Sequence, residues 1–313
     1  MIEATAPGKV ILFGEHAVVY GRPAVAAPVS HVRAKAVIER IDEREVWLSA
    51  PDLGLQSRLS QAGPDDPLAA VLRLVQAQPN GIELTGLSLK VQSDIPIAGG
   101  LGSGAAISVA VIRALVAYLG LGETFDSERI SQLAYEVERL HHGNPSGIDN
   151  TVIAYEQAVY FVRQEPQNHI EVFAPARPLR LLIADTGIRS ATKDVVNDVR
   201  RQWTADQARF ETIFDACGRI AESGRQAILA GDLLTVGQLM VENHEWLVRM
   251  TVSAPRLDRL VEAARQAGAL GAKLSGAGRG GNVIALVNDS SEDQVREKLL
   301  ATGAVAVLAS DVG

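Results

Sequence analysis

The sequence predicts an α+β protein. Segments in which apolar and polar residues alternate, as at Ala34, Ala36 and Ile38, are typical of strands, and two longer runs between residues 105 and 141 have the spacing of helices. Of the 313 residues, 47% are apolar and 21% are charged, which is the balance of a globular chain. A chain of this length can bury a core as one large domain or two ordinary ones.

Strands are predicted in several parts of the first hundred residues. The segments with this pattern are KVILFG (9–14), AVVYG (17–21), RAKAVIERI (33–41), EVWLSA (45–50) and LSLKVQSDI (87–95). In the last of these, Leu87, Leu89 and Val91 alternate with polar residues, so we expect a strand with one solvated face.

Helices are predicted over residues 105–119 and 127–141. The first is apolar along most of its length, like a membrane span, but Arg113 lies at its middle and would cost roughly 2.5 to 3.5 kcal/mol in a bilayer. We therefore expect a buried helix. In the second, Ser127 is a candidate cap, and Gly143 and Pro145 follow its end.

The two prolines of APARP (174–178) mark the predicted boundary between a domain of residues 1–176 and a domain of residues 177–313. The predicted elements of the second domain are a strand at 179–186, helices to about residue 268, strands at 271–276 and 282–287, a helix from about Glu292 and a strand at 304–310. This order suggests a split β-α-β domain.

Charge and cysteine content exclude several classes of protein. The formal net charge is −7 and Lys and Arg form no block, which argues against a nucleic-acid partner. Cys217 is the only cysteine, which excludes a disulfide framework or a thiolate zinc site within one chain and indicates a reducing compartment. The N-terminal residues lack the pattern of a secretory signal, so we expect a cytoplasmic protein without a membrane partner.

A glycine-rich loop, IPIAGGLGSGAA (95–106), precedes the first helix. It is not a P-loop, because Gly104 is followed by Ala105 where Lys is required. Gly100, Gly102 and Ala105 match the dinucleotide fingerprint loosely, but the preceding strand has a polar face and no acidic strand end follows. Two interpretations remain: a loop whose backbone amides and helix N-terminus bind nucleotide phosphates, or a connection without a ligand.

Three separated segments resemble the GHMP kinase superfamily. They are residues 6–26 (APGKVILFGEHAVVYGRPAVA), 96–106 (PIAGGLGSGAA) and 273–282 (KLSGAGRGGN), and a fourth segment, ERLHHGNPSGIDN (138–150), resembles the branch that phosphorylates mevalonate. The resemblance implies the GHMP kinase fold, with an N-terminal ribosomal-protein-S5-domain-2-like domain and a C-terminal ferredoxin-like α/β sandwich. It also implies ATP and mevalonate as substrates, Mg²⁺ as cofactor, transfer to the 5-hydroxyl and a homodimer.

The resemblance assigns the catalytic residues. Asp149 is implied as the base that accepts the hydroxyl proton, and Lys9 as the ammonium beside it, which would favour the developing alkoxide. Read without the resemblance, Asp149 could be a helix N-cap and Lys9 part of a solvated strand face. The implied ATP-binding residues are Pro96, Ile97, Ala98, Gly99, Gly100, Leu101, Gly102, Ser103 and Gly104.

Metal and substrate residues follow from the same resemblance. Glu138, with Ser103, is implied as the Mg²⁺ ligand; the alternative is a surface role, which is common for helical glutamates such as the nearby Glu136. The implied substrate-binding residues are Lys9, Glu15, His16, Ser146, Asp149, Thr192, Gly276 and Ala277. Core packing could explain His16, and turn or cap chemistry could explain Ser146 and Thr192.

The chain departs from the family pattern at three positions. Gly104 replaces the second serine of the central loop, which is expected to help bind Mg²⁺; Arg279 and Asn282 replace a more usual Gly and Cys. We expect Ser103, water or Glu138 with the ATP phosphates to compensate at the metal, and the Arg279 guanidinium to reach a phosphate or a carboxylate.

Other functions stay open at this point. Lys9 together with Asp149 argues against galactokinase and homoserine kinase. A phosphomevalonate kinase would need further basic residues, which Arg189, Lys193 and Arg279 could supply. Some members of the superfamily bind ATP and ligand as sensors without turnover, and Gly104 gives that interpretation some support.

Overall fold

The computed structural model describes residues 1–78, 83–96, 100–142 and 145–313, and the chain divides into two compact units. Unit 1 comprises Met1–Gly8, Val32–Pro96 and Gly102–Glu156, and unit 2 comprises Lys9–His31, Ile97–Leu101 and Gln157–Gly313. Strands β1 (Ile2–Phe13) and β2 (Ala24–Arg40) each contribute residues to both units. The division into consecutive domains after residue 176 stays a prediction.

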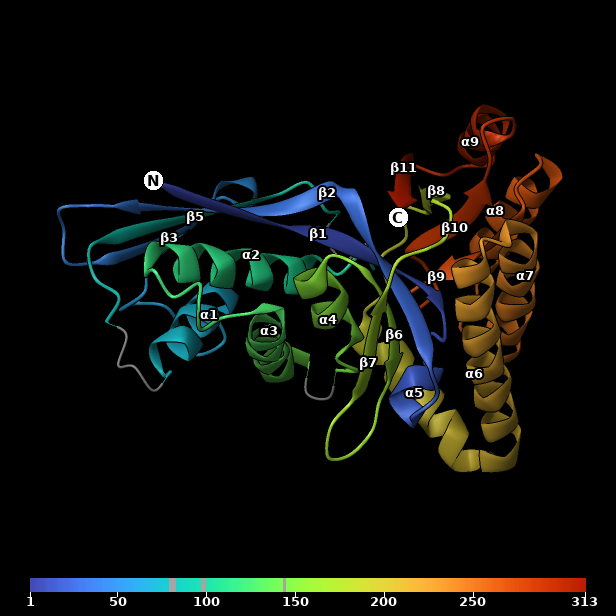
Figure 1. Ribbon diagram of the computed structural model, residues 1–313, viewed down its shortest axis with the longest axis horizontal. Helices are drawn as coiled ribbons and strands as arrows, with labels where there is room; N and C mark the ends of the chain where they lie inside the picture. The colour runs from blue at the N-terminus through green and yellow to red at the C-terminus, as the bar shows by residue number, and fades with distance from the viewer. Residues whose placement is uncertain (79–82, 97–99, 143–144) are drawn as a thin grey trace. The chain divides into compact units, whose positions relative to one another are not determined.

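Unit 1 is a sheet with helices on one of its faces (Figure 1). Its further elements are β3 (Val46–Ala50), η2 (Pro51–Leu53), β4 (Leu55–Arg58), α1 (Pro67–Gln76), β5 (Leu87–Ser93), α2 (Ser103–Tyr118), α3 (Ser127–His142) and α4 (Ile148–Tyr155). The end of β2 pairs antiparallel with β5, β5 pairs parallel with β3, and β3 pairs antiparallel with β4. The predicted alternation is confirmed, since Leu87, Leu89 and Val91 are buried and Lys90 is exposed.

Helix α2 is the buried centre of unit 1, as its apolar sequence predicts. Arg113, the charge at its middle, donates to the carbonyl oxygens of Thr5 at 2.8 Å and Ala154 at 2.9 Å, and pairs with Glu156. These partners compensate the burial of a guanidinium and fix α2 against the end of α4. Among the residues that the structure describes, no helix is long and apolar enough to cross a membrane.

Unit 2 contains the predicted split β-α-β arrangement. Its elements are η1 (Ala17–Tyr20), β6 (Ala158–Val162), β7 (His169–Phe173), β8 (Leu179–Asp185), α5 (Thr192–Ala205), α6 (Gln207–Ala230), α7 (Leu233–Arg249), α8 (Pro255–Gln266), β9 (Gly271–Ser275), β10 (Asn282–Val287), α9 (Glu292–Ala301) and β11 (Ala306–Val312). One antiparallel sheet has the order β11-β8-β10-β9, which is the ferredoxin-like order. In unit 2 the start of β2 also pairs with β6, and β6 with β7.

The prediction of a strand at AVVYG is wrong, because Ala17–Tyr20 form the 3₁₀ helix η1. The preceding turn prevents an extended chain: Gly14 has φ 92°, His16 has φ 59°, and the Val18 amide donates to the Gly14 carbonyl oxygen at 3.1 Å. A Cβ at Gly14 would lie 2.5 Å from the Pro23 carbonyl oxygen, so only glycine fits there. Val18 and Val19 are β-branched and favour strands, but here the turn before them determines the local structure.

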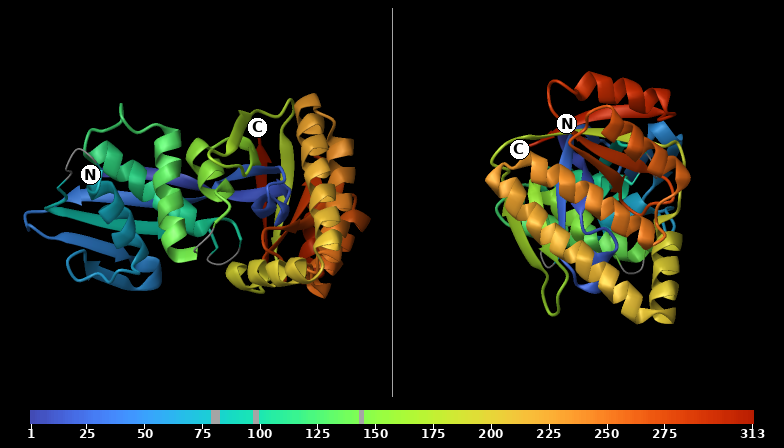
Figure 2. Two further views of the ribbon diagram at one scale, coloured as in Figure 1. Left: turned by 90° about the horizontal axis from the view of Figure 1, so that it is seen from below. Right: turned by 90° about the vertical axis from the view of Figure 1, so that its right-hand side faces the viewer.

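Helix α7 approaches strand β9 backbone to backbone. A Cβ at Gly237 of α7 would lie 2.3 Å from the Leu270 carbonyl oxygen, and a Cβ at Gly271 would lie 2.1 Å from the Gly237 carbonyl oxygen. Along its length α7 also packs against α6, and the two long helices run side by side (Figure 2). Glycine at both positions is thus a requirement of packing.

We predict that Gly237→Ala lowers the free energy of unfolding by about 1 to 3 kcal/mol, because overpacking outweighs the better helix propensity of alanine. Gly104→Ala is the matched control: Gly104 is also helical, but a Cβ there meets nothing within 4 Å. We expect it to raise stability by about 0.5 to 1 kcal/mol. Urea unfolding of both variants tests the pair, and equal effects at the two positions would contradict the packing argument.

Candidate active site

The N-terminus of α2 in unit 1 has backbone amides that no side chain caps. Gly102 is the N-cap with φ 73° and provides no side-chain cap, and the first helical hydrogen bond runs from the Ala106 amide to the Gly102 carbonyl oxygen at 2.9 Å. Helix geometry leaves the amides of Ser103, Gly104 and Ala105 without acceptors inside the helix. These donors and the helix dipole favour a phosphate at this end.

Helix α3 presents Glu138 and Glu136 on different faces. Glu136 lies within 3.4 Å of Arg139 in an ion pair, and Glu136 and Glu138 are both half-buried. Sequence alone could not separate the two. The assignment of Glu138 as the metal ligand stays a prediction.

Asp149 lies in the first turn of α4. Gly147, with φ 89°, occupies the N-cap position, and the Ser146 hydroxyl oxygen accepts from the Ile148 amide at 3.4 Å. The alternative interpretation of Asp149 as the N-cap is therefore wrong, and Ser146 has a local turn contact in addition to its predicted role. A carboxylate in the first turn is stabilised by the helix dipole.

A buried polar cluster fixes α4 against α3 beside Asp149. The Asn150 amide donates to the carbonyl oxygen of Ser131 at 3.0 Å and to its hydroxyl at 2.8 Å, and Thr151 donates to the Gly147 carbonyl oxygen at 2.7 Å. Asn150 is 3% exposed and Ser131 is 5% exposed. Since Ser131 and Glu138 lie on one helix, this cluster sets the distance between the helices that carry Glu138 and Asp149.

In unit 2, Lys9 lies where the central loop meets the C-terminal hairpin. The side chain is buried, and the Lys9 amide donates to the Leu101 carbonyl oxygen at 2.9 Å. The Gly100 carbonyl oxygen lies 3.6 Å from where a Cβ of Gly276 would be. Three segments that are far apart in sequence thus meet within this unit, as the resemblance implies.

His16 binds the same hairpin. Its Nε2 lies 2.8 Å from the Ala277 carbonyl oxygen, an acceptor that requires the proton on Nε2. Burial lowers the pKa of His16, and the Arg279 charge lowers it further, although the Ala277 hydrogen bond opposes both. A neutral imidazole follows, with its Nδ1 lone pair available as an acceptor.

Glu15 is buried against a residue that the sequence did not single out. Its carboxylate pairs with the ammonium of Lys273 on β9, and the two side chains are 1% and 0% exposed. Burial raises the pKa of Glu15 and lowers that of Lys273, while each partner's charge opposes the change in the other. Lys273 stands in the quoted segment KLSGAGRGGN, so a search of that segment for ionisable residues would have found it.

Arg279 lies in the hairpin between β9 and β10, with φ 56°. Its guanidinium pairs with Asp198 of α5 and donates to the Thr251 carbonyl oxygen at 3.2 Å, and its amide donates to the Val252 carbonyl oxygen at 2.7 Å. The carboxylate that Arg279 was expected to reach is therefore one from this chain. Thr192 begins α5 and is exposed.

The remaining predicted ATP-binding residues are distributed as follows. Pro96 is half-buried, Gly100 and Gly104 are exposed, and Leu101 is buried. Ile97, Ala98 and Gly99 lie outside the described residues. Because Lys9 belongs to unit 2 and Asp149 to unit 1, the predicted meeting of these two residues stays a prediction.

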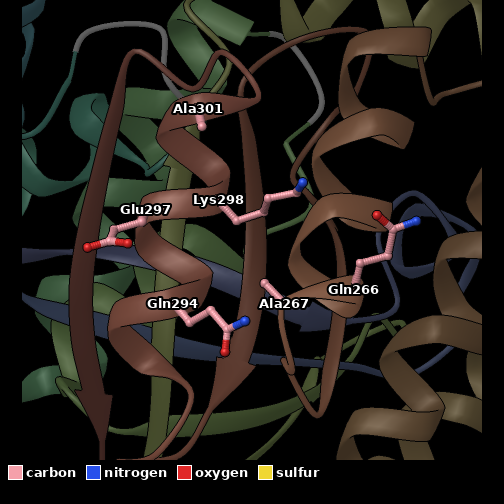
Figure 3. A pocket seen from close by; sticks show the side chains of 6 residues that line it. All are labelled: Gln266, Ala267, Gln294, Glu297, Lys298 and Ala301. Atoms are coloured by element: carbon pink, nitrogen blue, oxygen red, sulfur yellow. The ribbon is translucent and has the colours of Figure 1, made fainter.

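Within the described ranges, no group of three or more His, Cys, Asp or Glu side chains forms a metal cage. A surface depression involving α8 and α9 is lined by Gln266, Ala267, Gln294, Glu297, Lys298 and Ala301 (Figure 3). None of the predicted site residues lines it, and its polar side chains are of mixed type, so we do not assign it to the active site.

Family descriptions, relatives and solved structures match this chain over most of its length. The family described as GHMP kinases N terminal domain matches residues 63–157, and GHMP kinases C terminal matches residues 225–305. Mevalonate kinase of Pyrococcus abyssi is 35% identical over 307 residues, 91% of this chain and 88% of the relative. The crystal structure of L. major mevalonate kinase in complex with R-mevalonate has a TM-score of 0.85 and 30% identity, covering 100% of this chain and 96% of that one.

The two-unit α+β fold together with these matches defines a small-molecule kinase, and the chain belongs to the GHMP kinase family. The resemblance inferred from the sequence and the α+β fold class are confirmed. Streptococcus pneumoniae phosphomevalonate kinase also has a TM-score of 0.85, at 20% identity, with 99% and 100% of the two chains covered. The fold alone therefore does not distinguish these kinases, whereas the relatives at 35% identity are named mevalonate kinase.

We predict that Asn150→Ala lowers the free energy of unfolding by about 1 to 3 kcal/mol, because the buried Ser131 carbonyl oxygen loses its Asn150 donor. Gln132→Ala, at an exposed position of α3 next to Ser131, is the control and should change stability by no more than about 0.5 kcal/mol. Chemical denaturation measures both. An Asn150 variant as stable as its control would show that the cluster does not hold α4.

Proposed function

We propose that this protein transfers the γ-phosphoryl group of ATP to the 5-hydroxyl of mevalonate. The observation that supports the proposal most strongly is the similarity over nearly the whole chain to proteins named mevalonate kinase, including the 30% identical structure with R-mevalonate. All four motifs on which the resemblance depends lie within this similarity. A cytoplasmic location and a homodimer stay predictions from the sequence.

In the proposed mechanism the ATP phosphates bind the amides at the start of α2. The hydroxyl oxygen of mevalonate attacks the γ-phosphorus, the bond to the bridging oxygen breaks, and ADP leaves with that oxygen. Asp149 accepts the hydroxyl proton, and the Lys9 ammonium stabilises the negative charge that develops on the attacking oxygen. The neutral His16, with its Nδ1 acceptor, is proposed to orient a hydroxyl of the substrate.

The proposed metal is Mg²⁺, and the available donors suit it. Glu138 offers a carboxylate and Ser103 a hydroxyl at the helix start, both hard oxygen donors, and Mg²⁺ commonly binds through one or two carboxylates together with substrate phosphates. When bound, the ion would neutralise charge on the transferring phosphoryl group. Glu138 and Ser103 would hold it.

Phosphomevalonate kinase is the less favoured alternative. Such an enzyme needs free cations for a second phosphate, but Arg189 forms two hydrogen bonds of 2.8 Å with Asp185, and Arg279 pairs with Asp198. Two of the three candidate cations are thus already paired with carboxylates. A sensor without turnover is disfavoured by the presence of Lys9, Glu138 and Asp149 together.

We predict that Asp149→Asn lowers kcat by about 10²- to 10⁴-fold, because the base is lost, while ATP binding is retained. A coupled assay of ADP release measures kcat on mevalonate, phosphomevalonate, homoserine and galactose, and calorimetry measures ATP affinity. Wild-type protein should turn over mevalonate. Normal turnover by the variant would remove Asp149 from the mechanism, and absence of turnover on all four compounds would favour the sensor.

We predict that Gly104→Ser lowers the Mg²⁺ concentration needed for half-maximal activity by several-fold, because it adds a hydroxyl to the helix start. The open space around Gly104 admits the side chain. Gly104→Ala is the control for the change in helix propensity without an oxygen. Mg²⁺ titrations of activity and of ATP binding check the expectation, and identical titrations for the Ser and Ala variants would count against a metal-ligand role at this position.

A further inference from the structure

Backbone strain in unit 2 is concentrated at the hairpin between β9 and β10. Within the described ranges, three of the four residues other than glycine that have a left-handed φ are His16, Thr251 and Arg279. All three meet at this hairpin: Nε2 of His16 lies 2.8 Å from the Ala277 carbonyl oxygen, and Nε of Arg279 donates to the Thr251 carbonyl oxygen at 3.2 Å. Such conformations are unfavourable for residues with a side chain and persist mainly at functional sites.

Helix α5 holds this hairpin through Asp198. One oxygen of the Asp198 carboxylate pairs with the Arg279 guanidinium and accepts from Gln202 at 3.0 Å, and Gln202 also donates to the Thr251 hydroxyl at 2.8 Å. The other oxygen pairs with Arg201 of the same helix at 2.7 Å. Asp198 therefore binds two guanidinium groups, of which only that of Arg279 belongs to the hairpin.

The neighbouring loops leave the hairpin little freedom. The Gly278 carbonyl oxygen accepts from the Ser190 hydroxyl at 2.7 Å, and a Cβ at Gly278 would lie 2.0 Å from the Val252 carbonyl oxygen. Close packing of this kind allows a small number of discrete arrangements, so a side-chain tie to α5 can select one of them. In the arrangement observed, the Ala277 carbonyl oxygen faces Nε2 of His16.

We propose that Asp198 and Arg279 are positioning residues for the substrate hydroxyl: their ion pair holds the hairpin so that the Ala277 carbonyl keeps the His16 proton on Nε2, which leaves Nδ1 to accept from the substrate. This inference depends on the proposed function, in which His16 orients mevalonate. Asp198 and Arg279 act through Ala277 and His16 and do not themselves touch the substrate.

The geometry argues against two other roles of Arg279. Direct binding of a substrate anion is disfavoured, because the guanidinium already pairs with Asp198 and donates to Thr251. A role in stability alone is disfavoured as well, since the side chains of the pair are 36% and 22% exposed and such pairs contribute little. Glycine would adopt the same backbone conformation without the steric cost of a Cβ.

The test compares the kinetics of wild type, Asp198→Ala and Arg279→Gln. Each variant should raise the KM for mevalonate by about fivefold or more and change the KM for ATP by less than about twofold, because the hydroxyl is no longer oriented. Arg279→Lys keeps the charge and should stay within about threefold of wild type. Arg201→Gln is the matched control: it removes the other guanidinium from Asp198 and should leave both KM values within about twofold.

A double-mutant cycle with His16 separates this role from a structural one. His16→Asn tolerates the left-handed conformation but is too short to bind both Ala277 and the substrate. Asp198→Ala added to His16→Asn should raise the KM for mevalonate by less than about twofold more, because the ion pair acts through His16. Effects that multiply in full would show that the pair acts by another route and would overturn the proposal.

The position of the His16 proton is a readout that needs no turnover. Nitrogen-15 chemical shifts should show Nε2–H in wild type and in Arg201→Gln, and a mixture of both tautomers in Asp198→Ala and Arg279→Gln. The wild-type tautomer in both of the latter variants, or an unchanged KM for mevalonate in both, contradicts the proposal.

The same measurements keep this proposal apart from the proposed function. A wild type that phosphorylates another compound of the panel refutes the mevalonate assignment alone, and the KM values are then measured with that compound. If wild type phosphorylates none, the proposed function fails, and the tautomers of His16 in Asp198→Ala and Arg279→Gln still decide whether the ion pair positions this imidazole.

Discussion

The N-terminus of α2, which no side chain caps, is the feature on which the rest of unit 1 depends. Backbone amides can bind a phosphate only if the helix that carries them is fixed, because their direction is set by the helix axis. Arg113 fixes α2 by donating hydrogen bonds to Thr5 and to the end of α4, and the Asn150 cluster fixes α4 against α3. The proposed phosphate site, the proposed base and the candidate metal ligand thus lie on one packed set of helices.

In unit 2, buried polar side chains fix the N-terminal motif against the C-terminal one. Ser275, His16 and the Glu15–Lys273 pair each connect the N-terminal motif to β9 or to the hairpin that follows it. Burial of such groups is costly unless they are hydrogen-bonded or paired, which makes their arrangement specific; among the described residues, Oε2 of Glu15 is the exception in this set. Two motifs separated by more than 250 residues are held together by these few contacts.

Much of this could be predicted from the sequence. The alternation at Leu87 and the apolar run around Arg113 determine burial locally, so their elements were predicted correctly. The AVVYG segment was predicted wrongly because the turn depends on Gly14 approaching Pro23, a tertiary contact. Lys273 was missed for the same reason: its importance follows from Glu15, which lies 258 positions away along the chain.

Arg279 illustrates how a residue other than glycine can hold a left-handed conformation in the hairpin. Arginine has fewer conformations in the unfolded chain than glycine, which favours the ordered hairpin, but its Cβ opposes this backbone geometry. The ion pair with Asp198 offsets the cost of this backbone conformation. The Arg279 guanidinium lowers the pKa of Asp198, so the stability that the ion pair contributes is lost only as the pH falls through that lowered pKa. Because both side chains are partly exposed, the attraction is screened by dissolved ions. Ionic strength, more than mild acidity, is therefore the solution condition to which this hairpin is sensitive.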